Sequence, residues 1–408
     1  MKILLLAYAC EPDRGSEPGV GWKWALNLAK DRTKDIYVLT RSNNRESVDA
    51  YWTKNICPNN LHFFYYDLPT PFIWGKHHGL PVNIYYSIWL QGCVGYMLEL
   101  HMKFEFDMVH HITFGVYRDV CPIYKLKIPY VLGPLGGGEA TPSGMMKMYS
   151  VKETVSERFR GLVNKISLLN PCLHKSFDHA SLIFTKTKET QTTLHKWRYK
   201  TLINLEIGID KTYKQNKQER DKELFIFVGR FVHWKGVKLA LKAFCIFQKA
   251  HPSAKMLFIG KGDMQSYINR IAMENGLDNN IQIIPWISQK ELAFYYDKSC
   301  AMLFPSLHDS SGNVVLEALS HGLPVICLDC GGPVGILGDN LMEMVEPTAN
   351  RSVDCVANGL AMKMAMLSSD SLKYSGISRK CLERAGMMLW ENTISNTYKL
   401  IEEKLSLQ

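Results

Sequence analysis

The fold is decided by residues 224–244, which read LFIFVGRFVHWKGVKLALKAF. The first five residues are apolar without polar alternation, which is typical of a parallel strand that is buried on both faces. A turn with two glycines follows, and a helical periodicity begins near Lys235. The stretch therefore predicts one strand–turn–helix unit of an α/β protein.

The same rhythm recurs along the whole chain, at about 25 residues from strand to strand in the second half, which is the size of a βα unit. We expect strands at 3–9, 36–40, 61–66, 108–113, 129–132, 182–185, 224–228, 256–259, 281–285, 301–304, 325–328 and 343–345. We expect helices at 22–30, 85–103, 151–169, 188–197, 235–249, 264–274, 289–298, 314–320 and 353–367. This alternation predicts two doubly wound sheets, with ligands bound beyond the carboxyl ends of the strands.

The break between the two sheets falls near the charged run 211–222, which we interpret as a solvated linker. We predict an N-terminal Rossmann-like domain over 1–205, a C-terminal one over 206–386, and a closing segment 387–408 with an amphipathic helix at 393–405. If the two sheets face each other, the reaction takes place in the cleft between them.

The composition is that of a globular protein, with 408 residues, 46% hydrophobic and 21% charged. The net charge of +9 is not gathered into long basic runs or a known motif, so we expect no nucleic-acid partner. The 11 cysteines are scattered, which is typical of reduced residues in a cytoplasmic protein. No apolar run reaches the roughly 18 residues of a membrane span, so we expect a cytoplasmic protein that can lie on a membrane without crossing it.

Two cations flank the turn after the strand 224–228. Arg230 and Lys235 lie between that strand and the next helix, where free backbone N–H groups and the helix dipole favour an anion. A guanidinium adds a bidentate fork and an ammonium adds a point charge. This pattern suits a diphosphate leaving group.

A second strand–helix junction spans residues 304–325. Ser310 or Ser311 is expected to cap the helix at 314–320, so that the backbone around Gly312, Asn313 and Val314 offers N–H groups to phosphate or sugar oxygens. Glu317 lies in this otherwise apolar helix. Because an unpaired buried carboxylate is costly, hydrogen bonding to sugar hydroxyls is a reason for its presence.

These two stretches resemble the retaining family 4 glycosyltransferases, whose E-x7-E signature is followed by G-x-P-V. Here Glu317 is the second acid and residues 322–325 read GLPV, while Asp309 stands where the family has its first Glu. The resemblance covers nearly the whole chain and is strongest over 224–335. It implies the GT-B fold, α/β with two Rossmann-like domains facing a central cleft.

The family's site residues follow from that resemblance position by position. Glu317 is expected to hold the ribose and Asp309 to face the donor sugar, with Arg230 and Lys235 on the diphosphate. Gly260 and Gly262 match a glycine turn at a strand end, and Ile287 matches the loop whose backbone reads the nucleobase.

The N-terminal half adds weaker matches. Gly19 and Gly21 resemble the family's first glycine loop, which approaches the donor phosphates. His110 and His111 end a strand, where the family has a histidine near the transferred sugar; alternation places the two on opposite faces, and the family pattern favours His111 as catalytic, with His110 acceptor-side. Glu139 closes a Gly-rich turn and is expected on the acceptor side.

The resemblance implies a retaining hexosyltransferase that moves a sugar from a nucleotide-diphosphate donor to a saccharide or lipid-linked oligosaccharide acceptor in bacterial surface polysaccharide synthesis. Because the chain has no D-x-D triplet, we expect neither metal nor other cofactor. In the family the last helix crosses back to the N-terminal domain. Alternatives are a sugar-nucleotide epimerase or a phosphorylase on the same fold, and a catalytically silent scaffold at the inner membrane.

A membrane contact is expected from residues 84–103 and 145–175, which mix aromatics, methionines and cations. Arg158, Arg160 and Lys165, with Phe159, Leu162 and Ile166, are able to form a basic amphipathic face against an anionic leaflet. The alternative is a surface helix whose apolar stripe packs into the core.

Overall fold

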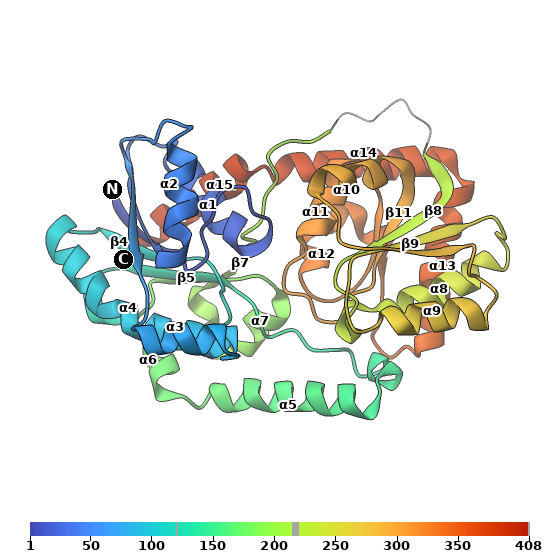
Figure 1. Ribbon diagram of the computed structural model, residues 1–408, viewed down its shortest axis with the longest axis horizontal. Helices are drawn as coiled ribbons and strands as arrows, with labels where there is room; N and C mark the ends of the chain where they lie inside the picture. Colours follow the sequence, from blue (N-terminus) through green and yellow to red (C-terminus); the bar gives the residue numbers. More distant parts are fainter. Residues whose placement is uncertain (120, 214–219, 407–408) are drawn as a thin grey trace. The chain divides into compact units, whose positions relative to one another are not determined.

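A computed structural model describes residues 1–119, 121–213 and 220–406, and its chain forms two compact units (Figure 1). Unit 1 comprises Met1–Gly138, Leu162–Ile207 and Trp390–Gln408, and unit 2 comprises Glu139–Gly161 and Gly208–Leu389. Residues 214–219 of the predicted linker lie outside the described residues. No helix among the described residues is long and apolar enough to cross a membrane.

The units differ from the predicted domains in one internal segment. Residues 139–161 were expected in the N-terminal domain, yet they belong to unit 2. The physical reason is a set of polar contacts, such as the ion pair between Glu153 and Lys238 at 2.8 Å. The final helix α15 (Trp390–Leu405) belongs to unit 1.

Unit 1 contains a seven-stranded sheet in the order β3-β2-β1-β4-β5-β6-β7, in which every pair of neighbours is parallel. The strands are β1 (Lys2–Leu6), β2 (Asp35–Arg41), β3 (Leu61–Tyr66), β4 (Met108–His111), β5 (Tyr130–Leu135), β6 (Leu182–Thr185) and β7 (Thr201–Ile203). The first six were predicted, with ends that shift by a few residues. The short β7 was not.

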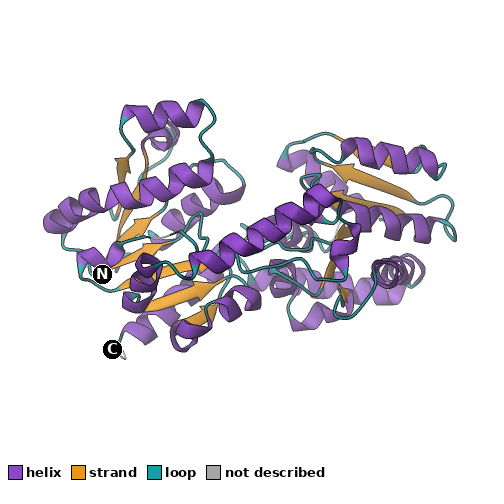
Figure 2. Cartoon of the chain, turned by 90° about the horizontal axis from the view of Figure 1, so that it is seen from below, coloured by secondary structure: helices purple, strands orange, loops and turns teal. Residues whose placement is uncertain are grey.

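The helices of unit 1 cover both faces of its sheet, with the strands between them (Figure 2). They are α1 (Ser16–Leu28), α2 (Arg45–Trp52), α3 (Thr70–His77), α4 (Val82–Phe104), α6 (Pro171–His179), α7 (Lys188–Thr193) and α15, while α5 (Val151–Ser167) begins in unit 2 and ends in unit 1. The core on one face joins Leu4 and Leu6 to the aromatic residues of α4. Helices α1 and α15 pack together on the other face.

Unit 2 contains a six-stranded parallel sheet in the order β10-β9-β8-β11-β12-β13. Its strands are β8 (Asp221–Val228), β9 (Lys255–Ile259), β10 (Ile281–Ile284), β11 (Ser299–Phe304), β12 (Val325–Leu328) and β13 (Val345–Glu346). Its helices are α8 (Val237–Gln248), α9 (Gln265–Glu274), α10 (Gln289–Lys298), α11 (Asn313–Ser320), α12 (Gly332–Leu337), α13 (Val353–Ser369) and α14 (Ser371–Met387). Helices α8, α9 and α13 lie on one face of this sheet, and α10, α11 and α14 on the other (Figure 1).

Both sheets are therefore doubly wound, as predicted. In unit 2 the strand order reverses between β8 and β11, which are direct neighbours. Ligands of open α/β sheets bind beyond the carboxyl ends of the strands at such a point. The two junctions singled out in the sequence, after Val228 and after Phe304, are the loops that leave these two strands.

Candidate active site

The loop after β8 and the loop after β11 lie against each other. The backbone N–H of Leu307 donates to the carbonyl of Trp234 at 2.8 Å, and the Ser306 hydroxyl donates to the same oxygen at 3.2 Å. Gly236 has φ +74°, and a Cβ there would lie 1.9 Å from the Pro305 carbonyl oxygen. Only glycine fits this position, because it combines a left-handed backbone with a close approach of two loops.

The structure brings Lys235 and Asp309 together across these loops. Their side chains form an ion pair, and both are largely shielded, with 16% and 17% of the side chain exposed. The Lys235 Nζ also lies 5.1 Å from the centre of the Phe304 ring. The two residues predicted to meet the diphosphate and the donor sugar are thus direct neighbours, and each neutralises the other.

Arg230 remains exposed at the carboxyl end of β8. Its guanidinium lies 5.6 Å from the centre of the Trp234 ring, a cation–π distance that orients the group without occupying its N–H donors. A diphosphate between Arg230 and Lys235 would find the Arg230 guanidinium accessible. The Lys235 ammonium would have to give up its ion pair with Asp309 before it could bind the phosphate.

Helix α11 begins differently from the prediction. Its N-cap is Gly312, and no side chain caps the helix, so neither Ser310 nor Ser311 has the capping role that we expected. Asn313 and Val314 open the helix and are only partly buried. An uncapped helix start leaves backbone N–H groups to be satisfied by water or by a ligand.

Glu317 lies one turn further along α11, and its carboxylate accepts hydrogen bonds from two polar side chains of α10. Gln289 Nε2 donates to Oε1 at 3.1 Å, and the Tyr296 hydroxyl donates to Oε2 at 3.3 Å. Burial raises the pKa of Glu317, and the two hydrogen bonds lower it in part. Gln289 and Tyr296 were missed in the sequence, although a spacing of seven residues places both on one face of α10.

The remaining predicted donor residues also follow strands of unit 2. The glycine turn after β9 packs on the β8 loop, where Cβ atoms at Gly260 and Gly262 would lie 2.1 Å and 2.5 Å from the carbonyl oxygens of Gly229 and Phe231. Ile287 follows β10 and is partly buried, next to Trp286, which is 73% exposed. These residues share the carboxyl edge of the sheet with the β8 and β11 loops.

The prediction for Gly19 and Gly21 needs a correction. Both lie inside α1, which begins at Ser16 and not at Trp22, and both are buried. Cβ atoms there would lie 2.1 Å from the carbonyl oxygens of Arg14 and Ala9. The glycines therefore permit the helix to approach its own chain, and they lie in a helix and not in the loop that we predicted. Their predicted approach to the donor phosphates stays a prediction.

His110 and His111 point to opposite faces of β4, as alternation requires, and both are buried. The ring of His110 has both nitrogens occupied, with Nδ1 at 3.0 Å from the Tyr398 hydroxyl and Nε2 at 3.0 Å from the Gly133 carbonyl. Burial lowers the pKa of His110 to about 3. This is the environment of a packed core histidine, and not of an acceptor-side residue.

His111 faces α4, where its Nε2 lies 2.7 Å from the Tyr86 hydroxyl. Burial lowers the pKa of His111 to about 4, so the ring is neutral near pH 7. Neutral imidazole is the form that the prediction required. The side chain is 3% exposed in this structure, and its catalytic role stays a prediction.

Glu139 belongs to unit 2 and not to the N-terminal domain in which it was predicted. Its side chain is 3% exposed, and its carbonyl oxygen accepts a hydrogen bond from Arg160 at 2.9 Å. Its predicted contact with an acceptor stays a prediction.

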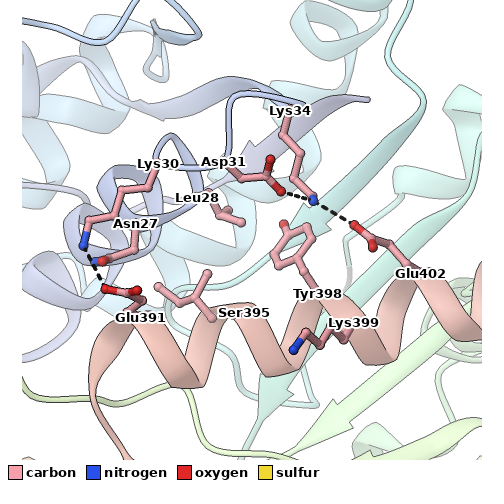
Figure 3. Close-up of a pocket in the computed structure, with 11 residues that line it drawn as sticks. Asn27, Leu28, Lys30, Asp31, Lys34, Glu391, Ser395, Tyr398, Lys399 and Glu402 are labelled. Carbon is pink, nitrogen blue, oxygen red and sulfur yellow. Dashed lines mark hydrogen bonds and ion pairs between the residues drawn. The ribbon is translucent and has the colours of Figure 1, made fainter.

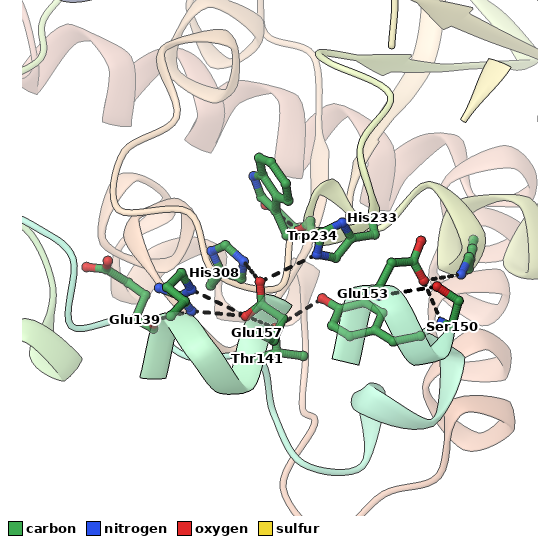
Figure 4. Close-up of polar contacts among 12 residues, drawn as sticks. Glu139, Thr141, Ser150, Glu153, Glu157, His233, Trp234 and His308 are labelled. Atoms are coloured by element: carbon green, nitrogen blue, oxygen red, sulfur yellow. Dashed lines mark hydrogen bonds and ion pairs between the residues drawn. The ribbon is translucent and has the colours of Figure 1, made fainter. Parts of the chain in front are cut away.

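A polar cluster near the two loops was missed in the sequence. Glu157 of α5 lies close to His233 in the β8 loop and to His308 in the β11 loop, immediately next to Asp309 (Figure 4). His308 lies within the strand–helix junction 304–325 and His233 within the stretch 224–244, so both histidines could have been noticed in the sequence. Glu157 is far away in the chain, and no local pattern connects it to either loop.

Two pockets of unit 1 lie away from the carboxyl ends of its strands. The larger, of about 350 Å³, is formed by the end of α1 and by α15, and its wall carries the ion pair of Lys34 with Glu402 at 2.8 Å (Figure 3). Lys34 directly precedes β2. The smaller pocket includes Ser181 and Lys200, which directly precede β6 and β7. Neither position is where a doubly wound sheet binds its ligand.

A family model matches the part of the chain that contains this candidate site. Residues 209–359 match the family model described as glycosyl transferases group 1. These residues form a group 1 glycosyltransferase domain. The domain contains all of the strand-end loops of unit 2 discussed above, from the β8 loop to α11.

Two curated relatives resemble parts of the chain around this glycosyltransferase domain. An uncharacterised glycosyltransferase of Methanocaldococcus jannaschii is 28% identical over 194 residues, which are 43% of this chain and 46% of the relative. The amylovoran biosynthesis glycosyltransferase AmsK of Erwinia amylovora is 24% identical over 126 residues, 29% of this chain and 31% of the relative. The chain spans less than half the length of the first curated relatives that it matches.

Solved structures extend the likeness beyond the glycosyltransferase domain to the fold of the whole chain. The structure of Anabaena HepE in complex with UDP and glucose matches with a TM-score of 0.59, covering 100% of this chain and 99% of that chain at 15% identity. The chain has the GT-B fold, with two doubly wound sheets.

Proposed function

We propose that this chain transfers a hexose from a nucleotide-diphosphate donor to a saccharide acceptor with retention of configuration, and that unit 2 binds the donor. One observation carries the proposal. The cations Arg230 and Lys235, the uncapped start of α11 and the carboxylate of Glu317 all lie beside the β8–β11 reversal of the sheet, within the group 1 glycosyltransferase domain. HepE, of the same fold, has been solved with UDP and glucose.

The roles follow from the charges. Transfer breaks the bond between the anomeric carbon and a phosphate oxygen, forms a bond from that carbon to an acceptor oxygen and releases the acceptor proton. Negative charge develops on the leaving diphosphate, which Arg230, Lys235 and the N–H groups of Asn313 and Val314 are placed to stabilise. Glu317 accepts hydrogen bonds from the ribose. Asp309, freed from Lys235, faces the sugar.

Nucleotide binding tests this proposal directly. The wild-type chain and Lys235→Ala are titrated with UDP and with GDP in a calorimeter. The control is Lys249→Ala, because Lys249 is an exposed residue at the end of α8. One charge-assisted hydrogen bond is worth about 1.5–3 kcal/mol, so Lys235→Ala should weaken binding about tenfold or more while the control stays like wild type. Failure of the wild type to bind either nucleotide would contradict the proposal, and unchanged binding by Lys235→Ala would remove that residue from the site.

Turnover separates transfer from the alternatives. A transferase needs an added saccharide to consume its donor productively, an epimerase changes the sugar nucleotide without one, and a silent scaffold does neither. The acceptor is proposed to be a saccharide or lipid-linked oligosaccharide of bacterial surface polysaccharide synthesis. Support for this comes from AmsK, which is named for amylovoran biosynthesis. No metal is required in this proposal, because protein cations meet the diphosphate.

We also propose that α5 contacts an anionic lipid surface from the cytoplasmic side. Its apolar stripe does not pack into a core, since Val155 is 60% exposed and Phe159 66%, and no residue of α5 is buried. Leu162 and Ile166 continue the stripe along the same helix, at 53% and 56%. The helix turns its polar side chains inward instead, as the contacts of Glu153 and Glu157 show.

Exposed cations accompany that apolar stripe. Lys152, Arg158 and Lys165 are exposed on α5, and each cation near an anionic leaflet contributes about 1 kcal/mol. Sedimentation with anionic and zwitterionic vesicles tests the contact. Phe159→Glu should lose binding to anionic vesicles, whereas Met362→Glu, at an equally exposed apolar residue of α13, should not. Equal binding of all three proteins, or of the wild type to both vesicle types, would contradict the contact.

A further inference from the structure

The two oxygens of the Glu157 carboxylate face two different sets of neighbours. Its Oε2 accepts from the Arg160 guanidinium at 3.2 Å and from the Thr141 hydroxyl at 3.4 Å, both on its own segment, 139–161. Its Oε1 lies 3.0 Å from His308 Nε2 and 3.5 Å from His233 Nε2 (Figure 4). One buried carboxylate thus joins that segment to the β8 and β11 loops.

Aromatic packing fixes the two histidines around this carboxylate. The ring of His308 stacks on Trp234, with centroids 5.7 Å apart and planes at 20°. The ring of His233 meets Tyr149 edge-on at 4.9 Å, and the Tyr149 hydroxyl lies 3.0 Å from Thr141. Each histidine therefore has a ring neighbour on one side and Glu157 on the other.

The carboxylate keeps its charge in this environment. Burial alone would raise the pKa of Glu157, but the imidazoles of His233 and His308, with the Arg160 guanidinium, hold the pKa well below its usual range. A permanently charged anchor suits a structural joint, because a buried charge that is hydrogen-bonded on both sides is costly to displace.

We propose that Glu157 is a positioning residue for the donor loops. By its hydrogen bond to His308, and by its position 3.5 Å from His233, it fixes the neighbouring Lys235 and Asp309, so that the nucleotide meets loops that are already arranged. The inference rests on the proposed function, since it assigns these loops to the donor. Its physical basis is preorganisation, because loops held in their binding arrangement lose less entropy when the ligand binds.

The first experiment needs no ligand. Hydrogen–deuterium exchange of the backbone is compared between wild type, Glu157→Gln and the control Glu153→Gln. Glu153 lies one turn earlier on α5 and pairs with Lys238 of α8, at 2.8 Å, but contacts neither histidine. Glu157→Gln should speed exchange in both 229–236 and 305–312, and Glu153→Gln should leave these two loops unchanged. Equal exchange in both variants would overturn the proposal.

The second experiment measures affinity for UDP and GDP in a double-mutant cycle of Glu157→Gln and His308→Gln. Loss of a charge-assisted hydrogen bond corresponds to about tenfold weaker binding or more. If Glu157 acts through His308, the double variant should bind the nucleotide with the same affinity as the single variant that binds it more weakly. Additive losses, or wild-type affinity of Glu157→Gln, would overturn the positioning role. Absence of binding by the wild type would overturn the proposed function instead, and the exchange experiment would still decide the role of Glu157.

Discussion

Glu317 is a carboxylate whose position costs stability. Burial raises its pKa, and only Gln289 and Tyr296 counteract this rise. The folded chain therefore keeps this proton to a higher pH than the unfolded chain does. Ionisation of Glu317 therefore lowers the free energy of unfolding as the pH rises through the pKa that Glu317 has in the folded chain. Below the pKa of Glu317 in the unfolded chain, the carboxyl is protonated in both states and the fold is not destabilised. A costly group of this kind is typical of a functional site.

Glu317→Gln should for this reason be more stable than wild type at pH 8 and equally stable near pH 4, while it loses nucleotide binding. One pKa unit corresponds to about 1.4 kcal/mol, and one kcal/mol moves the melting temperature by roughly 2–4 °C in a domain of this size. Thermal unfolding at the two pH values measures the difference. If the melting temperatures of Glu317→Gln and wild type differed by the same amount at both pH values, the explanation by a buried charge would be wrong.

Glu291 provides a control of opposite sign on α10. Hydrogen bonds from the Ser288 hydroxyl and backbone N–H, in a capping box, lower the pKa of Glu291. A lowered folded pKa stabilises above the unfolded pKa, and the stabilisation is lost as the pH falls through the folded pKa. Glu291→Gln should thus be less stable than wild type at pH 8, and the deficit should shrink in acid.

At the scale of elements, the candidate site depends on how closely two strand-end loops approach. The β8 and β11 loops share a backbone hydrogen bond and the ion pair of Lys235 with Asp309. Gly236 lies at the contact, where any Cβ would overlap the Pro305 carbonyl. The same loops carry the two histidines that lie beside Glu157.

Gly236→Ala should therefore separate the loops as well as strain one residue. The left-handed backbone alone costs an alanine about 1–2 kcal/mol, and the overlap with Pro305 adds to this. Gly276→Ala is the matched control, since Gly276 also has positive φ (+65°) but has nothing within 4 Å of the added Cβ. We expect both variants to lose stability in urea, and only Gly236→Ala to lose UDP or GDP binding as well. If both variants lost nucleotide binding to the same extent, the contact between Gly236 and Pro305 would not be important for binding.

In the molecule as a whole, the last helix, α15, belongs to the same compact unit as the first sheet. Helix α15 buries Trp390, Ile394 and Tyr398 within unit 1, and its Tyr398 hydroxyl is the partner of His110 on β4. Lys34 adds an ion pair to Glu402 at 2.8 Å. The two ends of the chain are thus parts of one folding unit.

Tyr398→Phe should loosen unit 1 selectively. It leaves Nδ1 of His110 buried without its partner, which costs about 1–3 kcal/mol. Hydrogen exchange should accelerate in β4 and α15, whereas β11 of unit 2 should be unaffected. Tyr199→Phe is the control, because Tyr199 is 80% exposed in the same unit. Faster exchange in β11 to the same extent would contradict this assignment.

Local patterns in the chain were enough to predict the two doubly wound sheets and the position of the two strand-end loops that form the candidate site. Strands such as 224–228 and 301–304 are continuous apolar runs because both of their faces are buried, and that pattern is local. The loops after them are equally local, since the charged and glycine residues follow each strand directly. For the same reason Arg230, Lys235 and Glu317 were predicted as site residues from local pattern, whereas Asp309 was predicted from the family resemblance, and their roles in the site stay predictions.

Contacts between residues that are far apart in the chain could not be predicted and became known only from the folded structure. Gly19 and Gly21 were read as an open loop because sequence does not say that their neighbours are Arg14 and Ala9. The segment 139–161 joined unit 2 through side-chain contacts that no local pattern encodes. Glu157 reaches His308 across 151 residues of chain, and a contact of this kind depends on packing between elements, which periodicity and propensity do not determine.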